Sequence, residues 1–330
     1  MIDPPAARVD KTGEAGYGAT MRLPGVGHAW TLPAMIAPWH AATALLATLS
    51  IVLVCAFPYL AQGEEPAAAK PAPLQCQRSA FRVVVDVGHT PEVPGAISAR
   101  GIPEYAFNLQ LARAIKQTLV DSGFDRTVLL MTATAPPTGL VKRAVAANNL
   151  RADLFLSIHH DSVPDNLLDT WQYEGQPQHF NDQFPGYAIF ISNDNPDRAG
   201  SLSFGKLLGK HLQAQGLQYT PHYTLPVMGH RRRELVDADA GVYRYDQLTV
   251  LRMTRMPAVL LEAGSIVNRQ EELELASAER QSAASAAIAG AVEDFCTARA
   301  AARKGERFAR RPPSGAPGHP DLTDPAPLAR

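Results

Sequence analysis

The sequence of 330 residues has almost no net charge, few cysteines and a low share of charged residues. Its 31 lysines and arginines nearly balance 32 aspartates and glutamates, which argues against a general nucleic-acid binder, because such proteins carry a basic excess. Three cysteines exclude a disulfide-dense scaffold. With 46% hydrophobic residues, the chain also holds too much apolar material to be disordered throughout.

Charge is missing altogether from one long stretch, since no Asp, Glu, Lys or Arg occurs in residues 23–63. Within it, residues 41–61 are apolar over a length that spans a bilayer as a helix, and a Pro/Ala/Glu linker follows over 62–75. We expect membrane targeting through 41–61, either as a retained transmembrane helix or as the hydrophobic part of a signal peptide. A buried core helix is the structural alternative.

Proline is concentrated at the two ends of the chain, where residues 1–75 and 299–330 hold 15 of the 27 prolines. Residues 1–40 show no periodicity and are predicted to be irregular. Residues 299–330 are basic and then Pro-rich, and are predicted to form a disordered tail. One folded domain over 76–298 is expected between them.

Within 76–298, short β-branched and aliphatic runs alternate with segments of helical periodicity. Strands are predicted at 81–86, 127–131, 154–158, 187–192, 248–251 and 257–261, and helices at 104–122, 140–150, 202–215 and 270–299. This alternation predicts an α/β fold, a single domain with a mixed central sheet flanked by helices on both faces.

Metal-binding side chains follow three of the predicted strands. These are His89, His159 and Glu262, and a fourth such residue, Glu104, opens the helix after the first strand. Sites in open α/β folds form at the carboxyl ends of strands, and two imidazoles with a carboxylate are typical of a hydrolytic zinc site. A further carboxylate nearby can act as general base and acid. Each residue alone also has an ordinary structural explanation, such as a hydrogen-bonded histidine or a glutamate at a helix start.

Several separated motifs agree, in order and spacing, with one known family. They stand at 86–89, 95–96, 101–104, 143–148, 152–159, 248–252 and 257–268. On these motifs the chain resembles the zinc-dependent N-acetylmuramoyl-L-alanine amidases of the bacterial cell wall, often called the amidase-3 type. The resemblance covers most of 80–298.

The resemblance implies that His89, Glu104 and His159 bind one zinc ion and that Glu262 is catalytic. The implied reaction is hydrolysis of the amide bond between N-acetylmuramic acid and L-alanine in peptidoglycan. It also implies peptidoglycan as partner and an activator protein as a further partner. The few basic residues before the apolar segment and the acidic pair after it indicate a periplasmic or other extracytoplasmic place in the cell envelope. The balanced charge argues against nucleic acid as a partner.

Other positions are assigned to substrate binding. Within the family's motifs these are Asn268 and Arg252, and His160 is expected to line the cleft rather than bind metal. The polar and aromatic stretch 163–186 is either a lid or substrate-binding loop, or a plain surface excursion. The basic run 231–233 either meets carboxylates of the stem peptide or forms a solvated surface.

Cys76 and Cys296 stand at the two edges of the predicted domain, whereas Cys55 lies inside the apolar segment. A disulfide between Cys76 and Cys296 would join the two ends of the domain in an oxidising compartment. Two free thiols at separate sites are the alternative.

Two other functions fit the same sequence. One is a different zinc amidase or peptidase that acts on cell-wall peptides. The other is a non-catalytic peptidoglycan-binding regulator, which would be expected to have lost a ligand or the catalytic glutamate. All four residues are present, which favours an enzyme.

Overall fold

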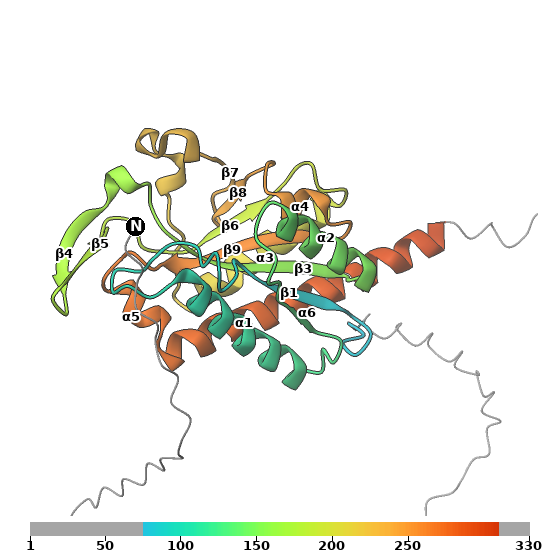
Figure 1. Ribbon diagram of the computed structural model, residues 1–330. Helices are drawn as coiled ribbons and strands as arrows, with labels where there is room; N and C mark the ends of the chain where they lie inside the picture. The colour runs from blue at the N-terminus through green and yellow to red at the C-terminus, as the bar shows by residue number, and fades with distance from the viewer. Residues whose placement is uncertain (1–74, 310–330) are drawn as a thin grey trace, which may run out of the picture. The chain divides into compact units, whose positions relative to one another are not determined.

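A seven-stranded sheet runs through residues 75–309, the part of the chain that the computed structural model describes (Figure 1). Its strands are β1 (Val83–Val87), β2 (Val128–Leu130), β3 (Leu154–Asp161), β6 (Ala188–Ile191), β7 (Glu234–Asp237), β8 (Val242–Arg244) and β9 (Ala258–Ser265). They lie in the order β2-β1-β3-β9-β6-β8-β7. The β6–β9 and β7–β8 pairs are antiparallel and the others parallel, so the predicted mixed sheet is confirmed.

Helices cover both faces of this sheet, as the alternating pattern predicted. They are α1 (Glu104–Asp121), α2 (Thr138–Leu150), α3 (Arg198–Ala214), α4 (Thr249–Met253), α5 (Glu271–Leu275) and α6 (Ala278–Ala309). Residues of α1, α3 and α6 share one apolar core with the sheet, and residues of α2 and α4 share the other (Figure 1). Both cores are buried, and burial of apolar side chains is the main term that stabilises such a layered fold.

The alternation of side chains along β1 decides which groups reach the site. Val83, Val85 and Val87 are buried in the core shared with α1 and α6, whereas Val84 belongs to the core on the α2 side. Because successive side chains point to opposite faces, Asp86 also lies on the α2 side. The three parallel strands β1, β3 and β9 end at the same edge of the sheet, which is where the site is built.

The strand predicted at 248–251 is wrong, because Thr249–Met253 form the short helix α4. A short apolar run has no periodicity that distinguishes a strand from a helix. Both edges of the adjacent strand β9 are already paired, with β3 and with β6, so the run has no free edge there. Leu248 instead accepts hydrogen bonds from the backbone N–H groups of Leu251 and Arg252.

The single helix predicted over 270–299 is also wrong, because the chain forms α5 and α6 with a break at 276–277. Ser277 causes the break: its hydroxyl oxygen accepts a hydrogen bond from the backbone N–H of Arg280 at 3.1 Å, which is an N-cap contact. Helix α6 then continues to Ala309, so the tail predicted from 299 is helical at its start.

The stretch 163–186 contains a two-stranded antiparallel hairpin, β4 (Asp169–Tyr173) with β5 (Gln176–Phe180). Three short 3-10 segments lie in the regions around it and before β7: η1 (Asp165–Leu167), η2 (His222–Thr224) and η3 (Pro226–Arg231). In Figure 1 the hairpin projects from the sheet beyond α5.

Cys76, just before β1, and Cys296, on α6, are joined by a disulfide, so the two ends of the domain are covalently linked. The expected irregular segment 1–40, the apolar segment 41–61, nearly all of the linker and the last part of the tail, 310–330, lie outside the described residues. No helix within residues 75–309 is long and apolar enough to cross a membrane.

Candidate metal centre

His89 follows β1 in a turn that only a few non-glycine residues adopt. Its φ is 65°, in the left-handed region, and this conformation turns the side chain toward β3. Arg143 of α2 holds the turn, because its guanidinium donates to the carbonyl oxygens of Val87 and His89. The same guanidinium donates to Asp86 Oδ1 at 2.9 Å, and Ser157 donates to Asp86 Oδ2 at 2.8 Å.

Two glycines make room for the site. A Cβ added to Gly88 would lie 2.5 Å from the His159 ring. A Cβ added to Gly95, which has a φ of +84°, would lie 2.3 Å from Glu104 Oε2 and 2.7 Å from the His89 ring. No larger side chain fits at either position without displacing a candidate ligand.

Glu104 is the first residue of α1 and its carboxylate is almost fully buried. Oε1 accepts hydrogen bonds from Asn108 Nδ2 at 3.1 Å and from the backbone N–H of His160 at 3.3 Å. Oε2 accepts one from the backbone N–H of Ala96 at 3.1 Å. Burial alone would raise the pKa of Glu104, but the contacts with His159 and His89 outweigh it and hold that pKa below the usual range.

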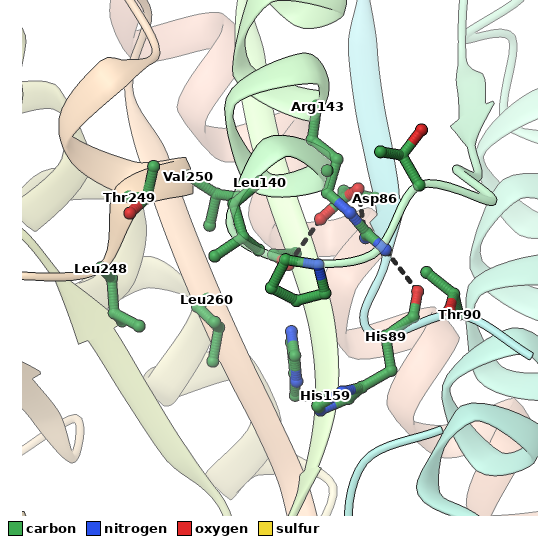
Figure 2. A pocket seen from close by; sticks show the side chains of 14 residues that line it. Asp86, His89, Thr90, Leu140, Arg143, His159, Leu248, Thr249, Val250 and Leu260 are labelled. Atoms are coloured by element: carbon green, nitrogen blue, oxygen red, sulfur yellow. Dashed lines mark hydrogen bonds and ion pairs between the residues drawn. The ribbon is translucent and has the colours of Figure 1, made fainter. Parts of the chain in front are cut away.

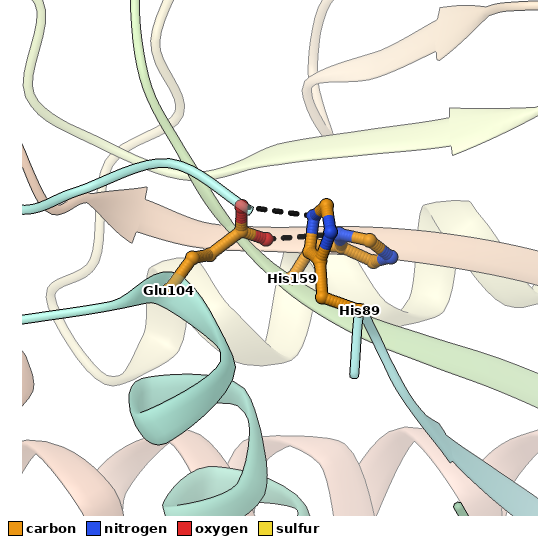
Figure 3. A group of neighbouring side chains, drawn as sticks. All are labelled: His89, Glu104 and His159. Carbon is orange, nitrogen blue, oxygen red and sulfur yellow. Dashed lines mark hydrogen bonds and ion pairs between the residues drawn. The ribbon is translucent and has the colours of Figure 1, made fainter. Parts of the chain in front are cut away.

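The three candidate ligands meet at one point (Figure 3). His89 Nε2 lies 2.9 Å from Glu104 Oε2, and His159 Nδ1 lies 2.9 Å from Glu104 Oε1. One ligand atom from each residue can be chosen so that all three lie within 4.8 Å of one another. Ligand atoms about 2.0–2.2 Å from a tetrahedral ion are roughly 3.3 Å apart, so these three side chains fit a zinc ion after small adjustments.

Glu262 lies directly beside this group. His159 of β3 pairs with Glu262 of β9 in the parallel register, so the two side chains lie on the same face of the sheet. Glu262 Oε2 is buried and has no hydrogen-bond partner among the described residues. Burial, together with the carboxylates of Asp161 and Glu104, raises the pKa of Glu262 well above its usual value.

An apolar cavity of about 180 Å³ opens beside the two histidines, on the α2 side of the sheet (Figure 2). The buried Asp86–Arg143 ion pair lies at one side of it. Its apolar wall comes from α2, β9 and the segment around α4, through Leu140, Leu248, Val250 and Leu260. The run 248–251 therefore helps to form the site, although as a helix.

The side chains of the remaining predicted residues do not contact the candidate ligands, although the backbone N–H of His160 donates to Glu104. His160 points away from His159: its Nδ1 lies 2.8 Å from Asn108 Oδ1, its ring packs against Phe107, and burial lowers its pKa to about 3. Asn268 caps α5, because its Oδ1 accepts hydrogen bonds from the backbone N–H groups of residues 270 and 271. Arg252 is exposed on α4 and does not line the cavity.

One cluster beside Glu262 has members that sequence reasoning did not single out. Asp161, at the end of β3, accepts hydrogen bonds from Tyr223 Oη at 2.7 Å and from the backbone N–H of Ser162. Arg231 Nη2 lies 3.5 Å from the same carboxylate, and His222 Nε2 lies 3.6 Å from its other oxygen. Asp161 directly follows the paired histidines, which was a usable signal, but nothing in the sequence connects Tyr223 to it across 62 residues.

A second, more polar cavity of about 220 Å³ lies between the hairpin and the loop before α1. Ala96, Ser98 and Ser162 line it together with Gln178 and His179 of β5. The backbone N–H of Ala96 also donates to Glu104, so one residue of the cavity wall contacts a candidate ligand. The stretch 163–186 is therefore part of the surroundings of the site.

Comparisons with known proteins agree on one family. The family model described as N-acetylmuramoyl-L-alanine amidase matches residues 83–294. The chain is 33% identical over 94 residues to the N-acetylmuramoyl-L-alanine amidase CwlM of Bacillus licheniformis, covering 28% of this chain and 37% of that protein. It is 26% identical over 234 residues to the amidase AmiC of Neisseria meningitidis, covering 64% and 52%. The chain thus spans about half, or less, of these relatives.

A solved structure gives the same fold. The amidase Ami1 of Mycobacterium smegmatis matches with a TM-score of 0.52 at 18% identity, over 69% of this chain and 100% of that one. At this identity the likeness establishes the fold alone.

Proposed function

The chain belongs to the N-acetylmuramoyl-L-alanine amidase family, and on this premise we propose that it hydrolyses the amide bond between N-acetylmuramic acid and L-alanine in peptidoglycan. The observation that carries the proposal is the meeting of His89, Glu104 and His159 beside Glu262. Two imidazoles and a carboxylate suit metal-assisted hydrolysis of an amide when they stand next to a second carboxylate, here one whose Oε2 has no hydrogen-bond partner within residues 75–309.

We assign His89, Glu104 and His159 as ligands of one zinc ion. A zinc ion bound there supplies Lewis acidity to a carbonyl oxygen and to water. The chain's part is to hold the ligands in place. Arg143 fixes the turn that carries His89, and Asn108 and the N–H of Ala96 orient the Glu104 carboxylate.

Glu262 is proposed to move the protons of the reaction. Its buried Oε2 has no partner within the described residues and is available to accept a proton from water. Glu262 would then return that proton to the amide nitrogen, which leaves as an amine. A pKa raised above the ordinary carboxylate range supports both steps near neutral pH, because the group then binds and releases a proton readily.

We place the activity outside the cytoplasm, in the cell envelope, because the substrate of this family lies there. Peptidoglycan is then the main partner, and an activator protein remains a proposed second one. Asn268 and Arg252 do not reach the candidate ligands in the structure. We therefore propose that they contact parts of the substrate that lie away from the cleaved amide.

The test is incubation of the purified protein with peptidoglycan, with and without a chelator, followed by mass analysis of the products. We expect release of stem peptides with a free L-alanine amino group, loss of release with chelator, and recovery on adding zinc. Products that are cut within the stem peptide would instead identify a peptidase, and binding without products would identify a regulator.

A further inference from the structure

Arg231 differs from its two neighbours in the basic run because it contacts the end of β3. Its Nη2 donates to the carbonyl oxygen of Ser162 at 2.7 Å and lies 3.5 Å from Asp161 Oδ1. Arg232 is exposed and donates to Thr224 on its own loop, and Arg233 lies over the Tyr245 ring at 3.6 Å. Arg231 and Arg233 are thus both half-buried, but Arg231 contacts the end of β3 and Arg233 the Tyr245 ring.

The guanidinium of Arg231 borders the candidate active site. Ser162 and Asp161 closely follow His159 on the chain, and Ser162 lines the polar cavity together with Ala96, whose backbone N–H donates to Glu104. The side chain of Arg231 is 31% exposed, so it is held by the protein and still open to a ligand.

The charges around the site indicate what kind of group Arg231 can bind. Glu104, Glu262 and Asp161 are carboxylates that would repel an anionic substrate. Arg143 is buried and committed to Asp86 and to backbone carbonyls. Arg280 donates to the carbonyl oxygen of Ala263 and lies 3.5 Å from Glu271. Arg231 is a partly exposed cation at the end of β3, where it can receive negative charge.

We infer that Arg231 is a specificity-determining residue that binds a carboxylate of the substrate's peptide, adjacent to the amide that is cleaved. The inference rests on the proposed function and names its substrate class, a stem peptide with a free carboxylate. A guanidinium donates two parallel N–H groups to a carboxylate, a geometry that a lysine ammonium lacks. Asp161, fixed by Tyr223, and Ser162 hold the side chain in place before binding, which lowers the entropy lost on binding.

The test uses two muropeptides that are identical except at the second stem residue, which carries a free α-carboxylate in one and a carboxamide in the other. The wild-type protein is expected to prefer the carboxylate form in kcat/KM by about tenfold to a hundredfold. Arg231→Ala should remove this preference, and Arg231→Lys should keep only part of it. Arg232→Ala is the matched control and should keep it in full.

A structural role of Arg231, or one exerted only through Glu262, would lower turnover of both muropeptides equally. That result, or a wild-type protein with no preference, would overturn the inference. Calorimetric binding of the two free stem tripeptides gives a second readout that needs no turnover. If neither muropeptide is cleaved, the proposed function fails. The binding measurement then decides the inference by itself. A preference for the carboxylate tripeptide that depends on Arg231 supports the binding role of Arg231, and the absence of this preference overturns that role.

Discussion

A positive φ costs a non-glycine residue roughly 1–3 kcal/mol, and His89 adopts one at 65°. The cost is offset locally, because Arg143 binds the carbonyl oxygens on both sides of Gly88 and is itself paired with Asp86. The neighbouring glycines allow side chains to approach where a Cβ would collide. The site thus depends on several residues that never touch a metal ion.

Glu262→Gln is expected to keep zinc bound and to lower kcat by about a hundredfold or more, because an amide cannot exchange the proton that the carboxylate carries. Metal content by atomic absorption and turnover of muropeptides are the two measurements. Glu279→Gln, an exposed change at the start of α6, is the control and should leave both unchanged. Turnover at the wild-type rate in Glu262→Gln would refute the proposed role.

Gly95→Ala is expected to weaken zinc binding about tenfold to a hundredfold, because the new Cβ would lie 2.3 Å from Glu104 Oε2 and displace a ligand. Competition with a chromogenic chelator measures the affinity. Gly216→Ala is a matched control, since Gly216 has a similar φ of +80° but nothing within 4 Å of the added Cβ. Equal losses in both variants would show that backbone strain alone is responsible.

His222 is expected to make the protein less stable as the pH falls below about 6.5. Burial, helped by Arg231, lowers the pKa of His222 to about 4, so between these values the unfolded chain takes up a proton that the folded one refuses. The slope is at most about 1.4 kcal/mol per pH unit for one group. Its stabilising contribution is complete above pH 6.5.

Urea unfolding of wild type and His222→Gln between pH 5 and 7.5 tests this slope. Asp161 acts in the opposite direction below about pH 6, because burial raises its pKa to about 6. The difference between variant and wild type is therefore the informative quantity. His179→Gln, an exposed change on the hairpin, is the control. If the free energies of unfolding of His222→Gln and the wild type vary with pH in parallel, the prediction is contradicted.

Among the elements, the hairpin β4–β5 is held against the rest of the fold partly by one aromatic residue, Trp171. Trp171 Nε1 donates to the carbonyl oxygen of Ala99 at 2.8 Å, and the guanidinium groups of Arg100 and Arg269 lie over the same ring at 5.4 Å and 5.2 Å. Because a two-stranded hairpin is marginally stable alone, these contacts, together with that of Arg269 over the Phe180 ring at 3.7 Å, help to keep it beside the polar cavity.

Trp171→Ala is expected to speed amide hydrogen exchange in residues 169–180 by about tenfold, since each cation–π contact contributes about 0.5–1 kcal/mol. Gln172→Ala, an exposed change on the opposite face of the hairpin, serves as the control. Mass spectrometry of exchanged peptides measures both. Unchanged exchange in Trp171→Ala would mean that other contacts hold the hairpin.

The sequence sufficed where a pattern is local and strong. The strands before His89, His159 and Glu262, and the helix that begins at Glu104, were predicted within a few residues because their apolar spacing is regular. Prediction from the sequence failed where tertiary contacts determine the local secondary structure. The run 248–251 becomes a helix because β9 has no free edge, and Ser277 divides a continuous Ala-rich segment.

The site residues also divide into those that a local pattern reveals and those that only tertiary contacts bring together. Metal-binding side chains at strand ends were visible, since parallel strands bring their ends together. Tyr223 and the contact of Arg231 with Ser162 were not, because both depend on how η2 and η3 fold back against the end of β3.

For the molecule as a whole, the Cys76–Cys296 disulfide closes a loop with a sequence separation of 220. A cross-link over such a loop restricts the unfolded chain, and removing one typically costs about 2–5 kcal/mol of stability. Replacing both cysteines by alanine is expected to lower the free energy of unfolding by this amount, measured by urea titration. A reducing agent should lower the stability of the wild type similarly and leave the double variant unchanged.

The same bond decides how the domain carries mechanical load. Tension applied between the chain before Cys76 and the chain after Cys296 passes through the two sulfur atoms and bypasses everything between them. The sheet, the candidate metal ligands His89, Glu104 and His159, and Glu262 are then not part of the force path. An enzyme tethered at one end and pulled at the other would keep its catalytic geometry until that covalent bond is reduced.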